Sequence, residues 1–186
     1  MKILAILSLV LALGLPGPAS ANPLPWARVG FYGNAEGTVH AVYDAGPGTL
    51  DIYVVLRNYE ASVGSGSVRF SAVPPPCFEA VYVGETSSYT VIGDSQTGAR
   101  IWHMMCFPGV YLLMTISFTV QGGTWDCCWF EPQPFPGESQ VYATDCSLSG
   151  SEWIDTEGLW INPNSPMTCT APVEETTWGA IKAMYR

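Results

Sequence analysis

Two histidines are the only side chains in this 186-residue chain whose ordinary pKa lies near neutral pH, so they are the first candidates for acid–base chemistry. A serine nucleophile would need His40 or His103, a carboxylate and a sharp turn that presents the serine. The Gly-x-Ser-x-Gly motif of such turns is missing from the sequence, and the stretch 64–67 predicts only a flexible turn. A small hydrolase is therefore a remote alternative, and we expect no enzymatic activity and no catalytic residues.

Paired carboxylates are a second candidate, because glycosidases use two of them beside the scissile bond. Asp126 with Glu131 and Asp145 with Glu152 are conceivable pairs. The chain has 16 acidic residues, however, and such pairs arise by chance at that density. We interpret these acids as solvated surface residues that keep an apolar chain soluble.

Oxygen ligands for calcium are offered by two acidic stretches that we expect on turns. Asp44 and Asp51 belong to the first, and Asp155 and Glu157 belong to the second. Neither stretch has the ligand spacing of an EF-hand loop. We predict no metal and no cofactor, and calcium at these turns is the alternative that stays open.

The N-terminus has the features of a signal peptide. Lys2 provides a positive charge, residues 3–15 form an apolar run, and Ala19-Ser-Ala21 matches a cleavage site. The run is shorter than the ~20 residues that a membrane-spanning helix needs. We predict a signal peptide over residues 1–21 and a protein that is secreted or displayed at the cell surface, with no membrane span after cleavage.

Six cysteines follow the predicted cleavage site, and an even count in an exported protein predicts three disulfides. They are Cys77, Cys106, Cys127, Cys128, Cys146 and Cys169. Neighbouring residues of a strand point to opposite faces, so the adjacent pair should bind different partners. Sequence cannot choose among the 15 pairings; our suggestion joins Cys77 to Cys106 and the adjacent pair to the last two cysteines. Zinc could use His103 and Cys106, but export favours disulfides.

Short alternating strands dominate the rest of the chain. Residues 50–56 and 110–120 are the strongest runs, and we expect the second to be a central strand covered on both faces. Gly and Pro together number 34, which favours turns between strands. We predict an all-β fold, an antiparallel β-sandwich over residues 38–165, after a loose lead-in over residues 22–37. The net charge of −9 argues against nucleic acid as a partner.

Seven tryptophans are many for this length, and exposed rings can stack on sugars. Trp125 and Trp129 lie four residues apart, so in one strand they would share a face. Trp153 and Trp160 flank an acid-rich turn. These four residues are the candidate glycan platform, and packing in the core is the competing interpretation.

The last 21 residues, 166–186, are predicted to form a linker and an amphipathic tail with a short helix. Trp178, Ile181 and Tyr185 fall on one stripe, with Met184 at its flank. A helix this short is unstable alone in water, so the tail needs a surface to dock on.

The tail also carries a resemblance. Residues 175–186 resemble a C-terminal signature, TTWG-x-(I/V)K-x-(L/M)YR, of uncharacterised secreted bacterial proteins. The strand 53–58 and the following Val68-Arg-Phe70 are similar to the opening of cohesin-like sandwiches. This resemblance implies an exported β-sandwich of immunoglobulin-like, cohesin-like or jelly-roll type, and it implies no catalytic residues.

Three functions follow in order of preference. The first is a non-enzymatic, exported structural or adhesion component at the cell surface or outside the cell, whose partner is a protein or a glycan. The second is a carbohydrate-binding module that uses exposed Trp and Tyr. The third is the small secreted hydrolase.

Overall fold

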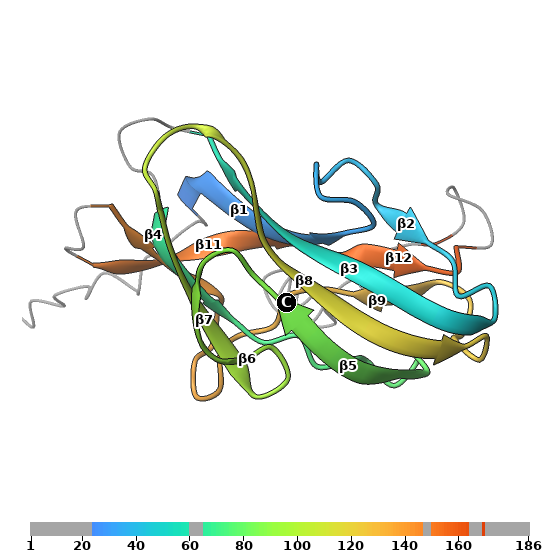
Figure 1. Ribbon diagram of the computed structural model, residues 1–186. Coiled ribbons are helices and arrows are strands. Elements are labelled where there is room, and N and C mark those ends of the chain that lie inside the picture. Colours follow the sequence, from blue (N-terminus) through green and yellow to red (C-terminus); the bar gives the residue numbers. More distant parts are fainter. Residues whose placement is uncertain (1–23, 60–64, 147–149, 164–168, 170–186) are drawn as a thin grey trace, which may run out of the picture.

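The computed structural model describes residues 24–59, 65–146, 150–163 and 169. Within these residues the chain forms twelve β-strands (Figure 1). They are β1 (Leu24–Tyr32), β2 (Ala41–Val42), β3 (Pro47–Asn58), β4 (Ser65–Phe70), β5 (Ala80–Thr86), β6 (Thr90–Asp94), β7 (Gly98–Met105), β8 (Gly109–Gln121), β9 (Cys128–Phe130), β10 (Tyr142–Asp145), β11 (Ser151–Glu157) and β12 (Leu159–Ile161). The described residues contain no helix long and apolar enough to cross a membrane.

Nine of these strands form one sheet in the order β5-β8-β3-β1-β11-β10-β4-β7-β6. The other three form a small sheet in the order β2-β12-β9. Most neighbours are antiparallel, but β1 runs parallel to β11 and β2 runs parallel to β12. Figure 1 shows β3 and β8 crossing in front of β1 and β11, with β5 beyond β8, so the large sheet folds back over itself into two layers.

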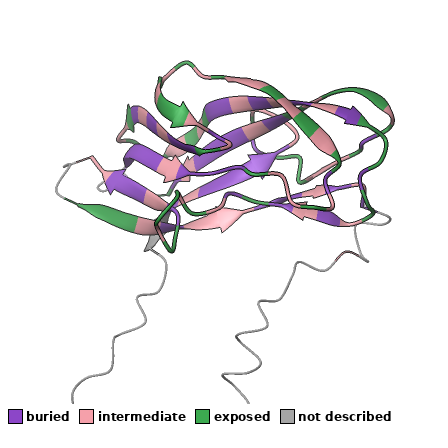
Figure 2. Cartoon of the chain, turned by 90° about the horizontal axis from the view of Figure 1, so that it is seen from below, coloured by how far each residue is buried: buried purple, intermediate pink, exposed green. Residues whose placement is uncertain are grey.

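Aromatic side chains from both layers meet in the core. Phe31 of β1 lies 4.8 Å from Phe130 of β9 and 6.2 Å from Phe70 of β4, measured between ring centroids. Phe118 of β8 approaches Phe130 at 6.0 Å. All four rings are fully buried, and Figure 2 shows the buried segments running through the interior of the sandwich. Burial of such rings supplies most of the energy that holds the layers together.

The predicted all-β sandwich is confirmed. The strongest runs of the sequence became β3 and β8, because alternating apolar residues bury one face of each strand. The loose lead-in over residues 22–37 is wrong for Leu24–Tyr32, which forms β1 in the middle of the sheet. The expectation that β8 is covered on both faces is also wrong, because Thr115, Ser117 and Thr119 of its outer face are partly exposed. The predicted signal peptide, tail helix and tail-docking residues lie outside the described residues.

All six cysteines form disulfides. The pairs are Cys77–Cys128, Cys106–Cys146 and Cys127–Cys169. The two adjacent cysteines do bind different partners, as predicted. The suggested Cys77–Cys106 bond is wrong, because the fold places Cys77, just before β5, against Cys128 of the small sheet. The suggestion that the adjacent pair binds the last two cysteines holds only for Cys127 with Cys169, because Cys146 pairs with Cys106.

We expect Cys77→Ala/Cys128→Ala to lower the free energy of unfolding by about 2–5 kcal/mol, the usual cost of losing a native disulfide. Cys106→Ala/Cys146→Ala is the matched control, because its bond spans 40 residues against 51 and its cysteines are only half-buried. The first variant should lose more, since Cys128 belongs to the core. Urea unfolding of both variants measures this, and an equal or smaller loss in the first would contradict the role given to Cys77–Cys128.

Candidate functional site

The outer face of β11, β10, β4 and β7 carries a continuous row of aromatic and arginine side chains. Trp153 pairs with Tyr142, Tyr142 pairs with Arg69, and Arg69 pairs with Arg100, each directly across from the next. Trp102 stands two residues after Arg100 on the same face of β7. We call these five residues the aromatic–arginine face. All five are partly exposed, while the residues on either side of Tyr142, Arg69 and Arg100 are buried in the core.

Stacking holds the two guanidinium groups of this face against rings. The Arg69 Cζ atom lies 5.5 Å from the centroid of the Tyr142 ring, and the Arg100 Cζ atom lies 4.8 Å from the Trp102 ring. Cation–π contacts of this kind fix a flexible side chain in one orientation. The face therefore presents a largely preformed surface on rigid strands.

The two arginines differ in their charge partners. Arg69 forms an ion pair with Glu138 from the loop before β10. Arg100 has no ion pair within the described residues, and its buried Nε has no hydrogen-bond partner there. Arg69 and Arg100 stand directly opposite each other on neighbouring strands, and like charges in such positions are destabilising unless one of them is compensated, as Glu138 compensates Arg69. The face thus keeps one uncompensated positive charge on a chain whose net charge is −9.

The four predicted platform tryptophans do not form one surface. Trp129 and Trp160 pair across the small sheet with their ring centroids 4.6 Å apart. Trp125 is 67% exposed in the loop before β9, and Trp153 lies in the large sheet. The expectation that Trp125 and Trp129 share a strand face is wrong, because Cys127 has a positive φ of 54° and β9 begins only at Cys128.

Asp44, a calcium candidate, instead accepts hydrogen bonds from the backbone. Its carboxylate receives N–H groups of Gly46, Gly122 and Thr124 at 3.4, 2.8 and 3.2 Å. Its own N–H donates to Asn162 Oδ1. Burial opposes ionisation, but the hydrogen bonds from Thr124, Gly122 and Gly46 outweigh it and hold the pKa of Asp44 below its usual range. Asp44 therefore connects the loops at the ends of β2, β8 and β12.

The other calcium candidates are also engaged within the chain. Asp155 accepts two hydrogen bonds from Arg28, and Glu157 accepts one from Tyr32. Both acids lie in β11, so their expected placement on a turn is wrong. Asp51 accepts a bond from the Ser117 hydroxyl. Within the part of the chain that the structure describes, no three His, Cys, Asp or Glu side chains gather closely enough to hold a metal ion.

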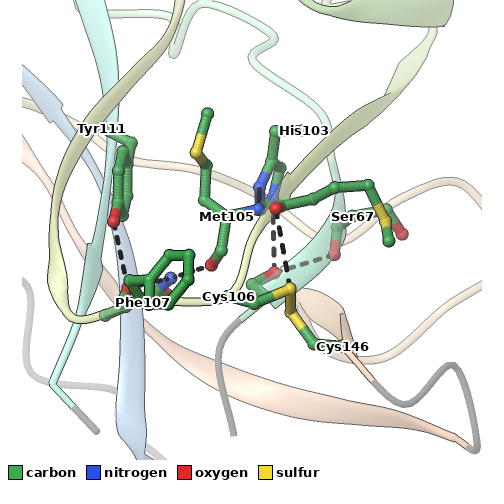
Figure 3. The surroundings of a disulfide bond; sticks show 10 residues. Ser67, His103, Met105, Cys106, Phe107, Tyr111 and Cys146 are labelled. Carbon is green, nitrogen blue, oxygen red and sulfur yellow. Dashed lines mark hydrogen bonds between the residues drawn. A yellow bond between two sulfur atoms is a disulfide. The ribbon is translucent and has the colours of Figure 1, made fainter. Parts of the chain in front are cut away.

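His103 is buried beside the Cys106–Cys146 disulfide (Figure 3). Its Nδ1 accepts the Met105 N–H at 3.3 Å, which leaves the proton on Nε2, 3.3 Å from the Ser65 hydroxyl. A catalytic base needs the opposite arrangement, with a free Nε2 that takes the serine proton. Burial lowers the pKa of His103 to about 4. The Ser65–His103 contact is therefore structural, and Cys106 is not available to zinc.

Sequence reasoning missed Arg69, Arg100, Trp102 and Tyr142. The signal was present, because each residue alternates with buried neighbours along its strand. What the sequence lacked was the order of the strands. β10, β4 and β7 are far apart in the chain, and only the fold makes them neighbours.

No protein-family model matches the chain, and no curated protein matches it. The chain is similar to solved structures of cohesin modules. The sixth cohesin of scaffoldin B from Acetivibrio cellulolyticus, solved in complex with a mutant Cel5 dockerin, has a TM-score of 0.49 and 10% sequence identity, over 74% of this chain and 98% of that chain.

Two further cohesins are similar at a comparable level. The cohesin module of a family 33 glycoside hydrolase from Clostridium perfringens gives a TM-score of 0.47 at 7% identity, over 74% of this chain and 97% of that chain. A non-cellulosomal cohesin from Archaeoglobus fulgidus gives 0.44 at 13% identity, over 83% and 96%.

We expect Asp44→Ala to lower the free energy of unfolding by several kcal/mol, since three backbone donors lose a charged acceptor. Asp51→Ala, which removes an exposed carboxylate bonded to one hydroxyl, is the matched control and should cost under 1 kcal/mol. Urea unfolding at neutral pH measures both. Equal losses would show that Asp44 does not have the connecting role.

Because of His103, the free energy of unfolding should decrease as the pH is lowered from about 6.5 to about 4. In this window the unfolded chain binds a proton at His103, whereas the folded chain does not, so the folded state loses up to about 3 kcal/mol. His103→Gln should flatten this part of the profile. A stability profile unchanged by His103→Gln would contradict the assignment of this pH dependence to His103.

Proposed function

We propose that this protein is an exported, non-enzymatic β-sandwich that acts as an adhesion or structural component outside the cell. The aromatic–arginine face is the surface through which it binds a protein partner. Export is supported by the signal peptide that the sequence predicts and by three disulfides, which persist in oxidising compartments.

The observation that carries this proposal is the composition of the face. Trp, Tyr and Arg are the residues that dominate binding energy at protein interfaces, and here five of them lie side by side. The face spans four strands, about 14 Å at the usual strand spacing. It could therefore form the centre of a standard interface.

Arg100 gives the face a preferred partner charge. Its guanidinium is held on the Trp102 ring and forms no ion pair among the described residues, so an acidic group of a partner can bind it without first displacing one. Arg69 is already paired with Glu138 and serves as packing for Tyr142. The interaction should therefore depend more on Arg100 than on Arg69.

A carbohydrate-binding module is the second candidate. It is supported by the exposed Trp125 ring and by the partly exposed rings of Trp102, Tyr142 and Trp153, because flat aromatic rings stack on sugars. A glycan array separates the two functions. Glycan binding that is lost on substituting these rings would favour the module.

We expect Arg100→Ala and Trp102→Ala each to weaken binding to the extracellular protein fraction of the source organism by about tenfold or more. Arg100→Lys keeps the charge but not the planar fork, and it should recover only part of the binding. Val81→Ala/Thr119→Ala, on the outer face of the other layer, is the matched control and should bind like the unchanged protein. Surface plasmon resonance on immobilised variants measures this. Equal binding by all variants would reject the aromatic–arginine face.

A further inference from the structure

The small sheet presents a second aromatic surface that the proposed function does not use. Cys128 and Phe130 of β9 and Leu159 and Ile161 of β12 point into the core. Because side chains alternate along a strand, Trp129 and Trp160 face outward as a directly opposed pair. Both rings are only partly buried.

The backbone beside this pair is shaped around the rings. A side chain at Gly158 would collide with the Trp129 ring, so only glycine fits at the start of β12. The Trp160 N–H bonds to the His40 carbonyl at 3.0 Å, which fixes β12 against the end of the loop before β2. The tryptophan pair is thus a defined surface.

The Cys127–Cys169 disulfide fixes the start of the C-terminal tail next to this pair. Cys127 stands two residues before Trp129, and its Cα lies 5.4 Å from that of Cys169. Seventeen residues, 170–186, follow the tethered cysteine. The chain therefore leaves Cys169 at the same edge of the small sheet that carries the two rings.

We propose that residues 170–186 dock on the Trp129–Trp160 pair of their own chain. The apolar stripe of the tail, Trp178, Ile181 and Tyr185, covers the two rings. A short amphipathic helix gains the surface that it needs, and the ring pair loses its contact with water.

Charge complementarity selects the same location. The end of the tail carries Lys182 and Arg186. Two exposed acids, Asp126 and Glu131, stand on either side of β9 in the sequence, and neither forms an ion pair within the described residues. Opposite charges at the rim of an apolar contact favour one orientation of the tail.

Because the Cys127–Cys169 disulfide tethers the tail, even a weak contact is enough to keep the tail on the tryptophan pair. Trp178 is nine residues beyond Cys169, so an extended chain reaches about 30 Å, well past the distance to Trp129. A tethered segment has a millimolar effective concentration at such a surface. The tail of another molecule would compete only at similar protein concentrations, which is why the docking is assigned within one chain.

The chain offers a specific chemical probe of this contact. Lys182 is the only lysine after Lys2, so a zero-length carbodiimide cross-linker has few amines to use. In the full exported chain we expect a monomeric product in which Lys182 is joined to Asp126 or Glu131. Lys182→Arg keeps the charge and should remove the product. Trp178→Ser/Ile181→Ser should reduce its yield at least fivefold.

A second measurement does not depend on cross-linking. The indole N–H signals of Trp129 and Trp160 in an NMR spectrum should shift when the chain is ended after Cys169, while the signal of Trp153 in the large sheet stays in place. Cross-links to other acids, including those of the tail itself, cross-links only between molecules, or unchanged indole signals would overturn the proposal. The result is independent of partner binding at the aromatic–arginine face.

Discussion

Strand β1 pairs with β3 on one side and with β11 on the other, and the rest of the structure depends on this double pairing. Without it, β5-β8-β3 and β11-β10-β4-β7-β6 would be separate sheets with two more open edges. Side chains reinforce the parallel pair, because Arg28 bonds to Asp155 at 2.6 Å and Tyr32 donates to Glu157 at 2.7 Å. Burial and the bond to Glu157 raise the pKa of Tyr32 to about 12, so this hydroxyl is protonated at neutral pH and can donate to Glu157.

The fold class could be predicted from the sequence, but the order of the strands could not. β3 and β8 alternate apolar and polar residues with β-branched side chains, and these local signals are enough. β11 is rich in acids, which are poor strand formers alone, and it is a strand because it pairs with β1 on one side and with β10 on the other. Disulfide pairing is non-local in the same way. Cys106 follows β7 and Cys146 follows β10, and these two strands come close only because β4 pairs with both of them.

The candidate site shows the same limit. The tryptophans do mark partly exposed aromatic surfaces. From the sequence they can be grouped only by their proximity in the chain, whereas the sheets group them by strand order. Trp153 therefore joins Tyr142 and Arg69, while Trp160 joins Trp129. The polar candidates have structural roles instead. Asp44 and His103 have the residue types of functional sites, but their hydrogen bonds are used to hold loops and strands together. The aromatic–arginine face remains as the place where side chains are positioned by the fold and left open to a partner.

Hydroxyl-radical footprinting of the protein bound to its extracellular partner tests the central claim most directly. The account predicts that oxidation of Trp102, Tyr142 and Trp153 falls several-fold in the complex, while the exposed Tyr43 and Phe107 are oxidised as in the free protein. Protection of Tyr43 or Phe107 with no change at Trp102, Tyr142 and Trp153 would place the binding surface elsewhere and contradict the account.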